Sequence, residues 1–181
     1  MLSNVPPKRR LVGILVYILS FLMLGSFIAK NFNIIFYLNK DIVPNFFQVF
    51  VANLTSSILL MMSNFLFGLG LFGVTYLSFS LGLQFYSVVL AYGVNNLLSI
   101  LPILSIHGLF EIAVMIIICN AAISNLAIWK HYLFGDLESL SHSYKVFFKN
   151  TFVKSLFWIF IFILIGSLLE TSLSTYLFKC L

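Results

Sequence analysis

Residues 109–129 read LFEIAVMIIICNAAISNLAIW, with Glu111 as the single charged residue. A helix needs about 20 mostly apolar residues to cross the hydrocarbon core of a bilayer, so this stretch is long enough to span one. Other apolar runs of comparable or greater length occupy residues 11–29, 42–104 and 152–178. These runs are continuous and do not alternate between apolar and polar residues, which favours helices over a membrane β-barrel. The sequence predicts an all-α, polytopic transmembrane helical bundle.

The composition supports the same prediction. The 181 residues are 61% hydrophobic and 8% charged, whereas roughly a quarter of the residues in a soluble domain are charged. The net charge of +5 would suggest nucleic acid in a soluble protein, but here the cations flank apolar runs and indicate topology and headgroup contacts. We expect a lipid bilayer and no nucleic acid as partner. The two cysteines, Cys119 and Cys180, are too few for a disulfide framework or a cysteine zinc site.

The distribution of lysine and arginine predicts the topology. Short cytoplasmic loops carry an excess of these residues, so the basic tail 1–10 is expected in the cytoplasm, followed by a single transmembrane domain 11–181 with a polar loop 131–150. An even number of spans before that loop places most of the cations on the cytoplasmic side, namely Lys8, Arg9, Arg10, Lys130, Lys145, Lys149 and Lys154. We therefore favour five spans, with or without a re-entrant segment in 42–104. Six spans are the alternative.

Small and amide residues interrupt the apolar runs. Gly70, Gly73 and Ser80 share one side of a helix, which predicts a helix-packing seam within the protein or toward a partner. Amide side chains in lipid usually turn inward to hydrogen-bond another helix. We expect this of the following residues, as buried polar groups: Asn53, Gln84, Asn95, Asn96 and Asn125.

His107 and Glu111 are the main functional candidates. They are four residues apart, so their side chains can touch on a helix, and an ionisable residue at the edge of an apolar run is a functional candidate. Three interpretations stay open: a structural tie at the start of the helix, a proton-sensitive or ligand-contacting site, and a metal or protease site. A zinc protease helix needs a second histidine at this spacing, and none follows. Since no other catalytic motif occurs either, we expect no catalytic residue, metal or cofactor, and a protein that is not an enzyme.

Several segments together resemble the stage II sporulation protein M family of bacterial membrane proteins. They are the basic tail before the first helix, Asn53, the glycine-rich segment FGLGLFG at 67–73, and above all SIHGLFEIAVMIIICNAA at 105–122. The family segment typically reads Pro-His-Gly-hydrophobic-Phe/Leu-Glu, matched here by His107, Gly108, Phe110 and Glu111. Ile106 replaces the usual proline, and Leu81-Gly82 stands where Asn-Gly is common, as in a divergent member.

The resemblance implies a subunit of a multi-protein membrane complex. The sporulation member is a membrane scaffold for peptidoglycan-degrading partners, and members encoded with circular bacteriocins, beside an ABC-type ATPase, would assist maturation, export or immunity. A composition rich in Phe, Asn, Ile and Lys suits the bacteriocin setting, in the cell membrane of a Gram-positive bacterium, with the bacteriocin peptide as ligand. The alternatives are a proton-sensitive permease for a peptide or small substrate that uses Glu111, and an intramembrane metal-dependent peptidase.

Overall fold

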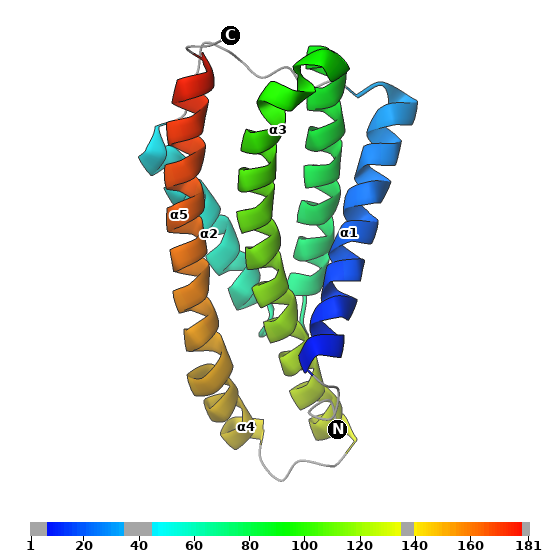
Figure 1. Cartoon of the computed structure of the whole chain (residues 1–181). Coiled ribbons are helices and arrows are strands. Elements are labelled where there is room, and N and C mark those ends of the chain that lie inside the picture. Colours follow the sequence, from blue (N-terminus) through cyan, green and yellow to red (C-terminus); the bar gives the residue numbers. More distant parts are fainter. Residues whose placement is uncertain (1–6, 35–44, 135–139, 179–181) are drawn as a thin grey trace.

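The computed structural model describes residues 7–34, 45–134 and 140–178, except for the side chains of residues 7, 88, 91–107 and 173–178. All regular structure in these ranges is helical: α1 (Pro7–Phe32), α2 (Phe46–Ser63), α3 (Gly70–Leu133), α4 (Leu140–Phe147), the π-helical turn η2 (Phe148–Phe152) and α5 (Val153–Phe178). The long helices lie side by side along a common direction (Figure 1). The predicted all-α transmembrane bundle is confirmed.

Helix α3 crosses the bundle twice. Its 64 residues would extend about 96 Å if straight, about three times the thickness of the hydrocarbon core. Instead α3 turns back on itself at the end of the bundle opposite the N-terminus (Figure 1). Gly93 and Pro102 fall between the two arms, and glycine and proline are the residues least compatible with a straight helix. We call residues 70–90 the first arm and Gly108–Leu133 the second arm.

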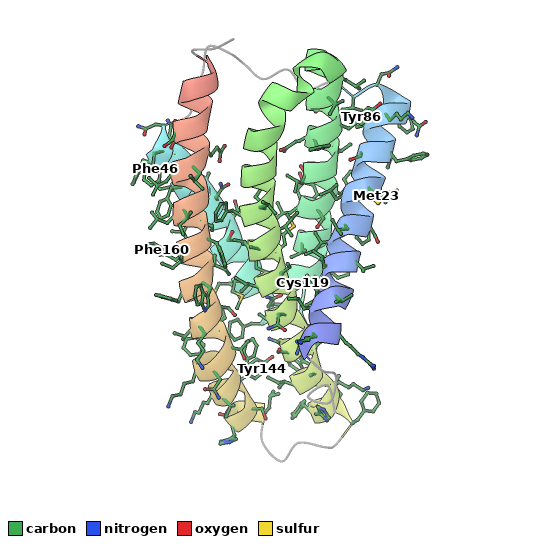
Figure 2. The ribbon with its side chains drawn as sticks, viewed as in Figure 1. Met23, Phe46, Tyr86, Cys119, Tyr144 and Phe160 are labelled. Atoms are coloured by element: carbon green, nitrogen blue, oxygen red, sulfur yellow. The ribbon has the colours of Figure 1, made fainter. Side chains whose placement is uncertain are left out.

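Four helical segments within the described ranges are long and apolar enough to cross a membrane: Lys8–Phe32, Phe46–Ser63, Gly108–Leu133 and Leu140–Ser172. The first arm of α3 is a fifth segment of membrane length, with more polar residues, and its Ser78 donates a hydrogen bond to the Met115 sulfur of the second arm at 3.2 Å. The described ranges therefore contain four candidate spans, and the favoured count of five stays a prediction. Large apolar side chains such as Met23 and Phe160 project from the outside of the bundle, as lipid contact requires (Figure 2).

Glycines bring α1 and the first arm into backbone contact. A Cβ atom on Gly82 would lie 2.0 Å from the carbonyl oxygen of Leu22, and one on Gly25 would lie 2.1 Å from that of Phe79. The short distance also lets the Ser26 hydroxyl donate a hydrogen bond to the carbonyl oxygen of Gly82 at 3.0 Å. Close approach of backbones at small residues is the usual way in which helices associate in lipid.

Gly70 and Gly73, two of the small residues predicted as a packing seam, pack against the α2 region. Cβ atoms on Gly70 and Gly73 would collide with Asn64 and Leu60 of the α2 region. Ser80, on the first arm, is partly buried, and its hydroxyl lies 3.5 Å from the Gln84 amide nitrogen, which donates to it. The structure therefore places the two glycines against α2, whereas the seam toward α1 is formed by Gly25 and Gly82, which the sequence analysis did not select.

Asn64 anchors the turn between α2 and α3. Its side chain is fully buried, and its amide nitrogen donates to the carbonyl oxygen of Ile118 at 3.2 Å. The backbone carbonyl oxygen of Asn64 accepts from the backbone N–H of Gly68 at 3.0 Å, in a turn where Phe67 and Gly68 have positive φ. Asn64 thus connects the end of α2 to the second arm of α3.

We expect Asn64→Ala to lower the free energy of unfolding by about 1–2 kcal/mol, because it removes one interhelical hydrogen bond and leaves a small void. The measurement is reversible denaturation in detergent micelles. Asn31→Ala is the matched control, because the exposed Asn31 amide donates only within α1, to Phe27. Equal effects of the two substitutions would contradict the role of Asn64.

The predicted bounds of the polar loop, residues 131–150, are wrong, because much of this range is helical. Helix α3 continues to Leu133, α4 begins at Leu140, and η2 joins α4 to α5 without an intervening loop. The reason is packing: Phe147 is buried in the core, and the Tyr144 hydroxyl donates to Asn125 of α3 at 3.1 Å. These contacts hold α4 against the second arm as a helix.

The last residues of the predicted basic tail 1–10 are helical. Helix α1 begins at Pro7, since proline is well tolerated in a first turn. The Arg10 guanidinium donates to the carbonyl oxygen of Asn120 at 2.8 Å and to the Ser124 hydroxyl at 3.0 Å. The start of α1 therefore packs against the second arm of α3.

The start of α1 and helix α4 lie at the same end of the bundle, and the C-terminal end of α5 lies at the other (Figure 1). Tyr86, late in the first arm, is at the opposite end from Tyr144 in α4 (Figure 2). We call the end with α4 the basic end. It carries Lys8 and Arg9 of α1, Lys130 of α3, Lys145 of α4 and Lys149 of η2.

Candidate functional site

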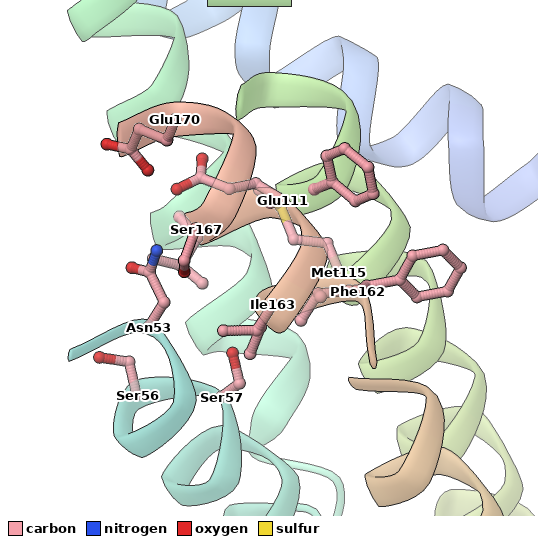
Figure 3. A pocket seen from close by; sticks show the side chains of 13 residues that line it. Asn53, Ser56, Ser57, Glu111, Met115, Phe162, Ile163, Ser167 and Glu170 are labelled. Carbon is pink, nitrogen blue, oxygen red and sulfur yellow. The ribbon is translucent and has the colours of Figure 1, made fainter. Parts of the chain in front are cut away.

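An acidic cavity lies between α2, the second arm of α3, and α5, away from the basic end. Its volume is about 120 Å³, enough for several water molecules. The polar side chains that line it are Asn53, Ser56, Ser57, Glu111, Ser167 and Glu170. Apolar side chains complete the lining, among them Phe110, Met115 and Phe162 (Figure 3). Both ionisable residues of this lining are acids.

Helical spacing explains why these residues face the same space. Asn53, Ser56 and Ser57 are three and four residues apart, so they share one face of α2. Ser167 and Glu170 are likewise three residues apart on α5. Gly166 also lines the cavity, and a Cβ atom there would lie 3.0 Å from that of Phe110. The absence of a side chain at Gly166 lets α5 approach the second arm of α3 beside the cavity.

The two acids come from different helices. The side chains of Glu111 and Glu170 are both partly buried, and their carboxylates turn to the same side of the cavity (Figure 3). One carboxylate oxygen of Glu170, Oε2, has no solvent-exposed surface. A cation placed between two carboxylates is attracted by both of them. The arrangement is suited to a positively charged group.

Ser167 adds a hydroxyl that the fold itself does not satisfy. Its side chain is 1% exposed, it lines the cavity, and its Oγ atom has no hydrogen-bond partner among the described residues. Buried polar groups in proteins are nearly always hydrogen-bonded, and an unsatisfied one costs about 1–3 kcal/mol. A bound group that accepts from or donates to Ser167 would remove this cost.

The cavity lies about two helical turns from the ends of α2 and α5, and it is partly open to the outside of the bundle, since Ser56 in its lining is exposed. Asn53 is seven residues from the start of α2, and Glu170 is eight residues before the end of α5. At 1.5 Å per residue these positions are about 10–12 Å from the helix ends. Ionisable residues at such a depth are costly and are usually found where a protein handles ions, protons or substrates.

The structure assigns the sequence candidates to different places. Glu111 and Asn53 line the cavity. Asn125 is fully buried and accepts the hydrogen bond from Tyr144 near the basic end. The prediction that Gln84 is buried is wrong: its side chain is exposed and donates to Ser80 one turn earlier, so the amide is satisfied without turning inward. The side chains of His107, Asn95 and Asn96 lie outside the described residues, so the His107–Glu111 pair stays a prediction.

Sequence reasoning missed Glu170. The signal was present, because Glu170 is an acid within the apolar run 152–178, and the rule that selected Glu111 applies to it equally. The serines of α2 and α5 gave no such signal, since serine is common in transmembrane helices as a packing residue. In the described ranges no three His, Cys, Asp or Glu side chains gather in a metal-binding group.

Comparisons of the chain with family models, with curated proteins and with solved structures gave no match in any of the three. The geometry of the cavity and the sequence are therefore what support a function.

Proposed function

We propose that this chain is a non-enzymatic membrane subunit of a peptide export or immunity complex, which holds a positively charged group of its substrate in the acidic cavity. The observation that carries the proposal is the convergence of Glu111, Glu170 and the unsatisfied Ser167 hydroxyl on one cavity inside the bundle. Membrane proteins place acids at this depth at a cost in free energy, which a cationic substrate offsets.

The family resemblance supports the setting. We propose membership of the stage II sporulation protein M family, on the match of His107, Gly108, Phe110 and Glu111. Of these four, Phe110 and Glu111 line the cavity. Within the family, the members encoded with circular bacteriocins fit this chain best, and their partner would be an ABC-type ATPase that supplies the energy for export.

The distribution of charge supports an orientation in the cell membrane. The described cations of α3, α4 and η2 share the basic end with the start of α1 (Figure 1), and cytoplasmic ends of membrane proteins are rich in lysine and arginine. We propose that the basic end is cytoplasmic. The acidic cavity, which lies away from the basic end, is then nearer to the outer side of the bilayer, where an exported peptide leaves the membrane and where an external peptide first meets the protein.

A permease that acts without partners is a second candidate, since Glu111 lines a cavity that a substrate could enter. The two candidates differ in one respect. The purified chain, reconstituted alone in liposomes, transports a fluorescent lysine-containing peptide if it is a permease. A subunit of an ATPase-driven complex binds the peptide but does not accumulate it.

The proposed function is tested by deleting the gene in the organism that encodes it and restoring it from a plasmid. We expect deletion to reduce the secreted antibacterial peptide, or the survival of the cells in their own culture supernatant, by about tenfold or more. Restoration should reverse the loss. Unchanged secretion and survival would contradict the proposal, and a defect in sporulation alone would replace it with the sporulation-type scaffold.

A further inference from the structure

We infer that the acidic cavity is a binding site for a primary alkylammonium group, the chemistry of a lysine side chain, held between Glu111 and Glu170. The inference rests on the proposed function for its biological setting. The lining of the cavity by itself supports the binding site.

The polar side of the cavity matches the three N–H donors of an ammonium group. Two carboxylates, from Glu111 and Glu170, turn to the same side of the cavity (Figure 3). Ser167 supplies a third acceptor, and its Oγ atom has no hydrogen-bond partner in the described part of the chain. Hydrogen bonds between an ammonium group and carboxylates are charge-assisted and about twice as strong as neutral ones.

The apolar side of the cavity matches the aliphatic stem. Phe110 and Phe162 lie with their ring centres 6.2 Å apart, and both line the cavity together with Met115. Aromatic rings and thioethers pack well against methylene groups and also attract organic cations. Among the residues that the structure describes, no three His, Cys, Asp or Glu side chains gather in a group that could hold a metal ion.

The size of the cavity is compatible with a short alkylammonium group. An engineered protein cavity of about 150 Å³ holds benzene, which has six heavy atoms. The volume here is about 120 Å³, which by the same proportion suits about five heavy atoms. The lysine side chain from Cβ to Nζ has five. A planar guanidinium on an arginine stem is larger and has five donors in a fixed fork.

The test uses the full chain in lipid nanodiscs and n-butylammonium as the probe, with binding followed by ligand-observed NMR. We expect saturable binding, at least about tenfold tighter than that of 1-butanol, the neutral analogue. Glu111→Gln and Glu170→Gln should each weaken binding about tenfold or more, and Ser167→Ala by a smaller factor. Binding of butylammonium no tighter than that of butanol would overturn the inference, and so would tighter binding of Ca²⁺ or of ethylguanidinium.

Two control substitutions separate the site from general effects. Glu138→Gln removes a carboxylate from the connection between α3 and α4, and should leave binding unchanged. Ser172→Ala removes an exposed α5 hydroxyl that donates within its own helix, to the carbonyl oxygen of Leu168, and should also have no effect. If either control weakens binding as much as the cavity variants do, the assignment of the site fails.

Lysine peptides and the ethanolamine headgroup of phospholipids share this ammonium chemistry. Nanodiscs with and without phosphatidylethanolamine distinguish them. Binding of N-acetyl-lysine methylamide that is unaffected by this lipid supports a peptide source, whereas loss of binding in its presence assigns the site to lipid and overturns the link to export. If a strain needs the gene for secretion but the purified protein does not bind butylammonium, only this inference is refuted. Normal binding without any cellular phenotype refutes only the proposed function.

Discussion

Gly82→Ala is expected to lower the free energy of unfolding of the bundle by about 3 kcal/mol, the upper end of the cost of overpacking a protein interior. The added methyl group would lie 2.0 Å from the carbonyl oxygen of Leu22 and 2.8 Å from its carbonyl carbon. Both atoms belong to the backbone of α1, so no side-chain rotation relieves the collision. The helices must separate, which also breaks the hydrogen bond from Ser26 to Gly82. Denaturation in detergent, followed by circular dichroism, measures the loss.

Two other glycines provide the controls for this prediction. A Cβ atom on Gly13 of α1, or on Gly108 of α3, would meet nothing within 4 Å. In a helix an unobstructed Gly→Ala change stabilises by roughly 0.4–1 kcal/mol, because it reduces the conformational entropy of the unfolded chain. Gly13→Ala and Gly108→Ala should therefore shift stability in the opposite direction from Gly82→Ala. If all three substitutions change the free energy of unfolding in the same direction, α1 and α3 do not pack as described.

The double variant Glu111→Gln/Glu170→Gln is expected to abolish function in cells while leaving the fold intact. Each carboxylate that contacts a cation contributes about 1.5–3 kcal/mol through a charge-assisted hydrogen bond, equivalent to about ten- to one-hundred-fold in binding. Glutamine has nearly the shape of glutamate and keeps a hydrogen-bonding carbonyl group, so the bundle should retain its fold. Secretion and self-protection of the complemented strain, together with the thermal stability of the purified protein, measure the two effects.

The combination of lost function and retained stability discriminates between roles for Glu111. If Glu111 is a structural tie at the start of the second arm, replacing it should destabilise the protein, and function should fall only because folding fails. Glu138→Gln, expressed to the same level, controls for the removal of a carboxylate in general. Loss of stability in Glu111→Gln, or normal secretion by the double variant, would count against the cavity as the functional site.

The sequence predicted properties of single helices, but it did not predict which helices pack against each other. Gly93 and Pro102 fall between the two arms of α3, which turns back on itself. The sequence selected Gly70 and Gly73 as a seam, but only the structure shows that they meet α2 and that Gly25 and Gly82 meet across α1 and α3. Periodicity identifies which residues share a face of a helix, and it does not identify what lies opposite that face.

The candidate site, too, could be predicted only in part from the sequence. Glu111 and Asn53 were selected separately, one as a functional candidate and the other as a buried amide. Their common role was not predictable, because they are far apart in the sequence and meet only through the packing of α2 and α5 against the second arm. Glu170 could have been found from its position in an apolar run. The unsatisfied hydroxyl of Ser167 could not, since hydrogen bonding depends on neighbours from other helices.

By itself the sequence determined that the chain is a helical membrane protein. The physical reason is that hydrocarbon leaves a long apolar segment only one way to satisfy its backbone, which is to form a helix. The tertiary structure alone decided which helices touch and that two acids from different helices share a cavity. Apolar surfaces are nearly interchangeable in lipid, so helix pairing is decided by local fit at small residues such as Gly25 and Gly82.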